Sequence, residues 1–375
     1  MDLNVGLFLS FAIAIQQLFL AIYLLGHKKG NRRNNRILGI LFLLFSINFI
    51  DFTLRSGGSF LTPAIVHLID DGFFLLYGPL IFLYIKGVVY RDFKLSLKSA
   101  FHFIPFIAYL IYILYLISAL KSEEQTEIIS NVDSSNISPW IIIASLSVYV
   151  HILVYLYLGW QELKTYRTII KDRFSSIEDV NLNWLSFIVK TFFIITIIAL
   201  IHNSLPIFGN KLFQYISLFV LFLACLFFIN RVLTKALNQP LIFSGISKEE
   251  SQKYSSSNIT EEAIFEFKKQ LQGLMETEKM FLQPKLTSHE LASHLNTNTK
   301  TLSQVLNQGF NKNFFDYVNS YRCEEVMRLL KDQHRNLTII EAMYESGFNS
   351  KSSFNKEFKK LTGQTPSEFK RSQDS

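Results

Sequence analysis

The sequence predicts an all-α protein in two parts: a bundle of seven transmembrane helices, then a polar cytoplasmic region in which a helix-turn-helix pattern occurs twice. Long apolar runs fill residues 1 to about 231, whereas the chain beyond about 245 is rich in Lys, Glu, Ser, Asn and Gln. Of the 375 residues, 49% are hydrophobic and the mean hydropathy is +0.24, more apolar than a soluble protein of this size requires. Apolar residues in the polar part recur at helical spacing.

Seven apolar runs are long enough to cross a bilayer, which takes about 20 apolar residues per helix. They lie near residues 5–26, 37–54, 64–85, 100–119, 139–159, 184–205 and 212–231. The first run has no basic region before it and no small-residue cleavage site, so we expect a retained helix rather than a signal peptide.

The distribution of Lys and Arg in the short loops predicts the orientation. With the N-terminus outside, the inner loops hold thirteen of them: Lys28, Lys29, Arg32, Arg33, Arg36, Lys86, Arg91, Lys94, Lys98, Lys164, Arg167, Lys171 and Arg173. The outer loops, which include the acidic loop 121–138, hold three: Arg55, Lys121 and Lys211. We therefore expect a multi-pass protein of the bacterial cytoplasmic membrane whose C-terminal region shares a compartment with the chromosome.

Polar residues inside the third run are the candidates for signal sensing, because each is costly in hydrocarbon. His67, Asp70 and Asp71 could form a ligand or ion site between helices, or could lie near the outer interface and stabilise the bundle locally. No pair of histidines is spaced for a metal on one helix face, and the two cysteines, Cys225 and Cys323, lie in different parts. We expect no metal and no other cofactor.

The predicted domains are 1–232 for the transmembrane bundle, 233–275 for a juxtamembrane linker and helix, and 276–375 for the doubled helix-turn-helix. Pro240 and the Ser-rich stretch 244–258 indicate the linker. A helix capped near Thr260 follows, with an apolar stripe at Ile264, Phe267, Leu271, Leu274 and Met275. This stripe could be a dimer seam or could pack on the next domain.

Two short amphipathic helices joined by a tight turn are predicted on either side of Asn296, which tolerates a left-handed backbone. Their apolar positions are Leu286, Leu291, Ala292, Leu295, Leu302, Val305 and Leu306. A longer helix follows at about 314–330. The pattern then recurs, with a helix near 338–345, a turn at Gly347, and Phe354 and Phe358 four residues apart on the second helix.

The stretch GFNSKSSFNKEFKKLTGQTPSEFKR, residues 347–371, resembles the C-terminal signature of the AraC/XylS family of transcription regulators. LTSHELASHL and NFFDYVNSYRCEEVMRLL resemble that family's first helix-turn-helix and connecting helix, so that about 90 residues are covered. The rest resembles membrane-bound members with a multi-helix N-terminal part. The chain departs from the family pattern at four positions: Val326, Met343, Lys356 and Phe369. The large Met343 is expected to alter how the helices of the second unit cross.

A recognition helix reads base edges with side chains near its N-terminal end, while other groups contact phosphates. On the first recognition helix we expect Thr299, Lys300, Ser303 and Gln304 to face DNA. On the second, we expect Lys351, Ser352, Asn355, Lys356 and Lys359 to do so. Residues 349–371 hold six Lys and Arg against two Glu, which suits a phosphate backbone.

No phosphate-binding glycine loop, nucleophile elbow or kinase signature is found, so catalysis is not expected. The expected partners are double-stranded DNA, a second copy of the chain, RNA polymerase and an unknown small-molecule or membrane signal; dimerisation is also implied by the family resemblance. One alternative is a seven-helix receptor or transporter whose tail binds a protein. Another keeps DNA binding but makes the helices a passive anchor.

Overall fold

The computed structural model describes residues 3–27, 31–57, 64–119, 139–178, 180, 182–205, 211–237, 260–332 and 334–373. Within these ranges the regular elements are helices, apart from isolated β-bridge residues such as the pair Phe174 and Thr287. The predicted outer loop 121–138 and the linker 244–258 lie outside the described residues. The chain divides into a bundle unit, 1–163 with 182–246, and a C-terminal unit, 164–181 with 247–375.

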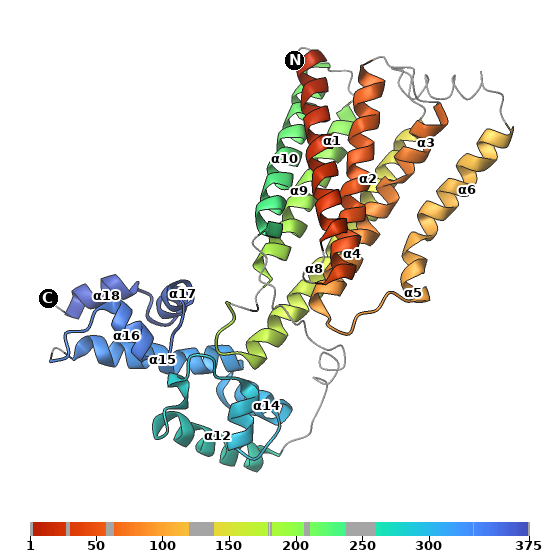
Figure 1. Ribbon diagram of the computed structural model, residues 1–375. Coiled ribbons are helices and arrows are strands. Elements are labelled where there is room, and N and C mark those ends of the chain that lie inside the picture. Colours follow the sequence, from red (N-terminus) through yellow and green to blue (C-terminus); the bar gives the residue numbers. More distant parts are fainter. Residues whose placement is uncertain are drawn as a thin grey trace. The chain divides into compact units, whose positions relative to one another are not determined.

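Each of the seven predicted apolar runs forms a helix or a helix pair in the described part of the bundle unit. The elements are α1 (Leu3–Gly26), α2 (Arg32–Ser56), α3 (Ala64–Gly72), α4 (Phe74–Val89), α5 (Leu97–Ala100), η1 (Phe101–Phe103), α6 (Ile104–Ala119), α8 (Pro139–Arg173), α9 (Asn183–Ser204) and α10 (Lys211–Leu237). Among the described residues, seven spans are long and apolar enough to cross a membrane. Figure 1 shows α1, α2, α9 and α10 running side by side, with α1 packed on α2 and α10.

The bundle unit carries large apolar side chains on its outside. Phe8 on α1 is 71% exposed, and Phe19 and Ile22 on the same helix are each 63% exposed. A surface of this kind is rare on soluble proteins, because apolar patches there are small. It is the surface expected of helices surrounded by hydrocarbon.

The third run was predicted as one helix from 64 to 85, but the structure divides it into α3 and α4 at Phe73. The N–H of Phe73 donates to the carbonyl of Asp70, a tighter turn than an α-helix has. Tyr109 of α6 lies against this break, and its hydroxyl donates to the carbonyl of Leu68 (2.7 Å). A Cβ at Gly72 would lie 2.6 Å from the Tyr109 ring, so the approach of α6 requires glycine there.

The C-terminal unit has two hydrophobic cores, and one helix contributes to both. Its elements are α12 (Glu261–Glu276), η3 (Met280–Leu282), α13 (Ser288–His294), α14 (Thr299–Phe310), α15 (Phe314–Lys331), α16 (Ile339–Glu345), α17 (Lys351–Thr362) and α18 (Pro366–Gln373). The first half of α15 buries Phe314 and Val318 in the core around α13 and α14. Its second half buries Val326 and Leu329 in the core around α16 and α17.

The predicted doubling of the helix-turn-helix is confirmed in detail. Thr287 caps α13 in a reciprocal capping box with Glu290, and Thr338 caps α16 in the same way with Glu341. Each first helix has seven residues and each second helix has twelve. The second helices also end alike, with a left-handed residue at Asn311 and at Gly363.

The apolar stripe of α12 packs on the C-terminal unit. Thr260 caps this helix as predicted, and its hydroxyl accepts the N–H of Ala263 (3.4 Å). Leu271 and Met275 are completely buried in the core that contains α13 and α14, with Phe267 and Leu274 packed against it. Of the two readings of the stripe, the structure therefore favours packing on the next domain over a free dimer seam.

Candidate nucleic-acid interface

Helix α14 presents a polar side away from its core. It begins at Thr299 because the side-chain oxygen of Asn298 accepts the N–H of Thr301 (2.9 Å). Leu302, Val305 and Leu306 are buried and fix the rotation of the helix. Of the residues predicted to face DNA, three are partly exposed: Thr299, Lys300 and Gln304.

Ser303 is not on the outward side of α14, contrary to the expectation. Its exposed fraction is only 7%. The side-chain amide of Asn307, one turn later, donates to the Ser303 carbonyl (2.9 Å) and to its hydroxyl (3.4 Å). Asn307 is itself exposed and was not predicted. Its spacing of seven residues from Lys300, two helical turns, is the signal that could have found it.

Helix α17 exposes all five of its predicted DNA-facing residues. These are Lys351, Ser352, Asn355, Lys356 and Lys359. The opposite side buries Phe354, Phe358 and Glu357. Ser350 caps the helix and Gly363 ends it with φ of 77°. The helix thus offers three lysines and two short polar side chains on one accessible face, a composition suited to phosphates and base edges.

Two of the basic residues counted in the 349–371 stretch serve the fold. Lys370 donates to the carbonyl of Leu337 (2.8 Å). Lys360 Nζ lies 2.8 Å from Asp316 Oδ1 and 3.8 Å from Glu357 Oε2. The hydrogen bond from Lys360 to Asp316 raises the pKa of Lys360, whereas burial raises the pKa of Glu357.

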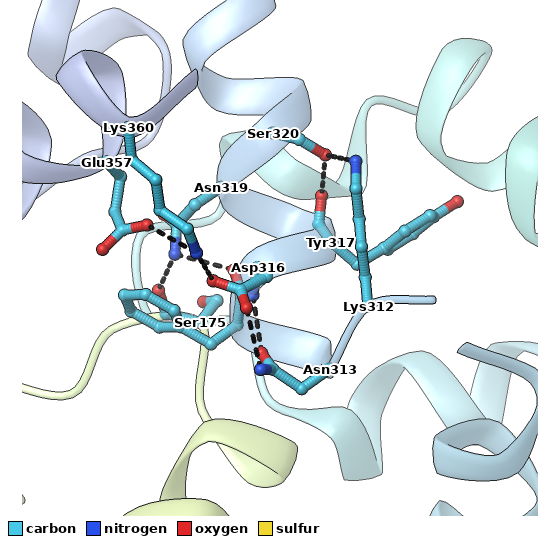
Figure 2. Close-up of polar contacts among 10 residues, drawn as sticks. Ser175, Lys312, Asn313, Asp316, Tyr317, Asn319, Ser320, Glu357 and Lys360 are labelled. Carbon is cyan, nitrogen blue, oxygen red and sulfur yellow. Dashed lines mark hydrogen bonds and ion pairs between the residues drawn. The ribbon is translucent and has the colours of Figure 1, made fainter. Parts of the chain in front are cut away.

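Figure 2 shows Lys360 of α17 together with its two acidic partners, Asp316 and Glu357. Asp316 stands at the start of α15, where it also accepts from the Asn313 side chain (2.9 Å). Lys360 stands near the end of α17, so its ion pair with Asp316 connects the second recognition helix to the first unit. Because α15 also contributes to both cores, it helps to position α14 and α17 within the C-terminal unit.

Arg322, on α15, was not predicted and is a buried arginine surrounded by hydrogen-bond acceptors. It is 1% exposed, and its guanidinium donates to the carbonyls of Phe281 (2.8 Å), Gln283 (2.6 Å) and Ser175 (3.2 Å). It also lies 5.8 Å from the centre of the Phe348 ring. Burial lowers its pKa to about 10, so it is still charged at neutral pH.

The sequence held a signal for Arg322. It is spaced four residues from Val318 and from Val326, both fully buried, so an arginine interrupts an apolar row of α15. A charged residue at such a position must be paired or bonded. Its partners, however, lie in segments far apart along the chain, and no sequence pattern indicates that these segments meet.

The candidate sensing residues lie together with two residues of α2. His67 Nδ1 contacts Asp51 Oδ1, and Arg55 Nη2 lies 2.6 Å from Asp51 Oδ2 and 3.3 Å from Asp71 Oδ1. Asp70 is 2% exposed, and its carbonyl accepts from the Asn48 side chain (3.0 Å). Asp51 was not predicted, and Arg55 was counted only as a loop charge.

Residues 291–372 match a protein-family model described as a helix-turn-helix domain. The match covers most of α13 and runs through α17 into α18. Neither the curated proteins nor the solved structures include a significant match to the chain. The domain match supports a DNA-binding transcription regulator.

Proposed function

We propose that this chain, whose residues 291–372 form a helix-turn-helix domain of the AraC type, is a membrane-anchored, sequence-specific transcription regulator. It couples a signal sensed at the membrane to gene expression. The observation that carries the proposal is the pairing of seven apolar helices with a doubled helix-turn-helix on one chain.

The exposed face of α17 supports DNA contact by the second unit. Lys351, Lys356 and Lys359 have no hydrogen bond or ion pair with the residues that the structure describes, so their charges are available to phosphates. Ser352 and Asn355 lie on the same face and can bond base edges. Thr299, Lys300 and Gln304 have the corresponding role on α14, with Ser303 left out because it is covered.

The excess of Lys and Arg in the predicted inner loops supports a C-terminal unit on the cytoplasmic side of a bacterial membrane. There the unit meets double-stranded DNA and RNA polymerase. We also propose that it acts as a homodimer, since one copy of this size makes limited contact with an operator.

The cluster of Asp51, Arg55, His67, Asp70 and Asp71 is the proposed sensing element. Buried charges in a membrane-spanning segment are costly, and here Asp51 and Asp71 pair with one arginine and one histidine, while Asp70 is buried on the same helix as Asp71. A small-molecule or membrane signal that alters this pairing would change how α2 and α3 pack.

Selection of DNA by the full-length protein in lipid nanodiscs tests the proposal. Random duplexes that bind are amplified, and the affinity of the selected site is compared with that of a scrambled one over a range of salt. We expect a preference for the selected site and an affinity that falls steeply with salt. No binding even at low salt would favour the alternative, a seven-helix receptor or transporter with a protein-binding tail.

Two further measurements separate the remaining alternatives. Reporter fusions at Ser375 give the location of the C-terminus, and an exported C-terminus contradicts the proposal. Replacing the bundle by an unrelated membrane anchor tests sensing. Unchanged output of a reporter gene under all conditions would make the helices a passive anchor.

A further inference from the structure

The loop between α8 and α9 is bound inside the C-terminal unit. Residues 164–181 group with that unit, although the chain on both sides of them belongs to the bundle unit. Phe174 pairs with Thr287, the cap of α13, in an isolated antiparallel bridge. Tyr166, in the last turns of α8, donates from its hydroxyl to the carbonyl of Val180 (2.5 Å) and holds the two ends of the loop together.

Ser175 is the centre of this contact, with an exposed fraction of 1%. Its N–H and its hydroxyl both donate to the carbonyl of Leu286 (3.1 and 2.7 Å). Its carbonyl accepts from Asn319 Nδ2 (3.1 Å) and Arg322 Nη1 (3.2 Å), and its hydroxyl accepts from Arg322 Nη2 (3.0 Å). Figure 2 shows the bond between Ser175 and Asn319 on α15. Every polar group of Ser175 is therefore engaged, which makes the contact specific rather than incidental packing.

The groups that hold Phe174–Ser176 connect the two helix-turn-helix units. Leu286 directly precedes the first unit, and Arg322 of α15, which bonds Ser175, also donates to the carbonyls of Phe281 and Gln283 ahead of that unit. On the other side, the Arg322 guanidinium faces the ring of Phe348 in the second turn, and the Ser176 hydroxyl donates to Asn349 Oδ1 (2.9 Å). The loop thus fills the point where the two units meet.

We propose that this meeting point, lined by Leu286, Asn319, Arg322 and Asn349, is a docking site for Phe174–Ser176 of the same chain, through which the bundle unit controls DNA binding. The docked loop holds the two recognition helices in the one arrangement that fits adjacent grooves. Release of the loop removes the contacts that bridge the two helix-turn-helix turns and lets the two units shift relative to each other about α15. The inference rests on the proposed function and names its regulation.

The loop is covalently continuous with α8 and α9, so movements of these two helices can reach it directly. Its first residues are the last turns of α8, and Leu182 after it directly precedes α9. A change in the packing of α8 or α9 in the bundle unit therefore acts on the loop without any diffusing intermediate. Holding two binding elements in the bound arrangement raises affinity by lowering the ordering cost of binding. The effect is expected only on DNA that engages both units.

The test uses the full-length protein in nanodiscs and two duplexes, the selected site and a version with one of its two half-sites scrambled. In S175A the loop loses the hydroxyl that bonds Leu286 and Arg322. We expect about a tenfold loss of affinity for the intact site, within the usual range of coupling between sites. Affinity for the single half-site is expected to stay unchanged.

A rescue variant of S175A tests whether docking of the loop is the cause of the loss. In it, an engineered disulfide holds the loop in place of the lost hydrogen bonds. Directly opposed residues of an antiparallel pair have Cα atoms about 4.5–5.5 Å apart, within the range a disulfide spans. In a protein with C225S and C323A, the variant F174C/T287C/S175A should recover the affinity for the intact site when oxidised and lose it on reduction. The reduced form is the control for the substitutions themselves.

Three outcomes overturn the inference: S175A binds the intact site as well as the original protein, both duplexes lose affinity equally, or oxidation restores nothing. If the unsubstituted protein binds neither duplex at low salt, the proposed function itself fails, and the inference fails with it. That result is distinct from the three above, because it does not depend on any variant.

Discussion

Asn296 and Gly347 occupy the same place in the two turns of the C-terminal unit. Both have positive φ, 51° and 88°, and their N–H groups donate to Ser293 and Tyr344, three residues earlier (3.1 and 3.0 Å). They differ in surroundings. A Cβ at Gly347 would lie 2.6 Å from the carbonyl oxygen of Phe281, in the segment that Arg322 also binds.

The substitution Gly347→Ala should therefore destabilise the second unit more than its backbone angle alone implies. Gly363 is the matched control, because it has φ of 77° but nothing within 4 Å of a Cβ. The left-handed conformation costs a non-glycine residue about 1–2 kcal/mol, so G363A shows only that loss. G347A adds a clash with backbone. Cys323 is buried in the core of the second unit, so the rate at which a thiol reagent labels it reports how often that core opens. We would measure this rate for G347A and for G363A, each in a protein that also carries C225S. Equal labelling rates would contradict the clash.

The outward lysines of α17 should contribute charge rather than sequence preference. We expect K356A/K359A to weaken binding to selected and scrambled DNA alike and to reduce the salt slope by about 2, one per lost phosphate contact. K356R/K359R preserves the charge and should retain the slope. The measurement is affinity against salt for both duplexes. A loss confined to the selected site would assign these lysines to base reading instead.

Ser303 and Asn355 occupy corresponding positions on the two recognition helices but differ in burial. Ser303 is 7% exposed under the Asn307 amide, whereas Asn355 is exposed. N355A should therefore cost about 1–3 kcal/mol of affinity for the selected site, the usual value for a base contact. S303A should change affinity less than about threefold, a difference under about 0.7 kcal/mol. A larger loss in S303A than in N355A would show that the rotation of α14 is different.

The ion pair between Lys360 and Asp316 should couple the two units weakly but measurably. The Lys360 side chain is 58% exposed and that of Asp316 is 23% exposed, so the pair is only partly shielded from solvent. A double-mutant cycle of K360A and D316A, read by Cys323 labelling, should give a coupling energy of about 0.5–1 kcal/mol. Full additivity would mean that α15 fixes α17 through its apolar contacts alone.

Glu357 should make the C-terminal unit less stable as the pH rises. Burial raises its pKa in the folded protein above the ordinary value of 4.5, so the charged form is disfavoured by folding. The penalty is absent well below pH 4.5, grows as the pH rises past that value, and is complete above the folded pKa. E357Q should therefore be more stable than the original protein at pH 7 and equal to it at low pH.

The control is the substitution E341Q, which should change stability at pH 7 in the opposite direction. Hydrogen bonds from Thr338 lower the pKa of Glu341, so its charged form stabilises the folded state above pH 4.5 and this contribution is lost as the pH falls through the folded pKa. E341Q should thus be less stable at pH 7. Parallel behaviour of E357Q and E341Q would contradict the assigned causes.

The elements could be predicted from the sequence because each depends on local patterns. The length of the apolar runs identified seven spans, and the capping residue Thr260 marked a helix start. The five outward residues of α17 followed from Phe354 and Phe358, whose spacing fixes which side is buried. These inferences require only helical periodicity.

The rest depends on contacts between distant segments. The burial of Ser303 depends on a side chain one turn away, and the break at Phe73 on Tyr109 of α6. Arg322 contacts residues of η3, of the α8–α9 loop and of the turn between α16 and α17. The loop itself was read as a cytoplasmic connection, because its position among the C-terminal helices leaves no periodic pattern in the sequence.

The central claim is that the membrane-inserted chain reads DNA with both recognition helices at once. Hydroxyl-radical footprinting of the selected site with the full-length protein in nanodiscs tests it most directly. We predict a pair of protected patches on one face of the duplex for each bound copy, with the two centres of a pair about 10 base pairs apart, as two helices in adjacent major grooves require. A single patch, or no protection at concentrations that saturate binding, would contradict the claim.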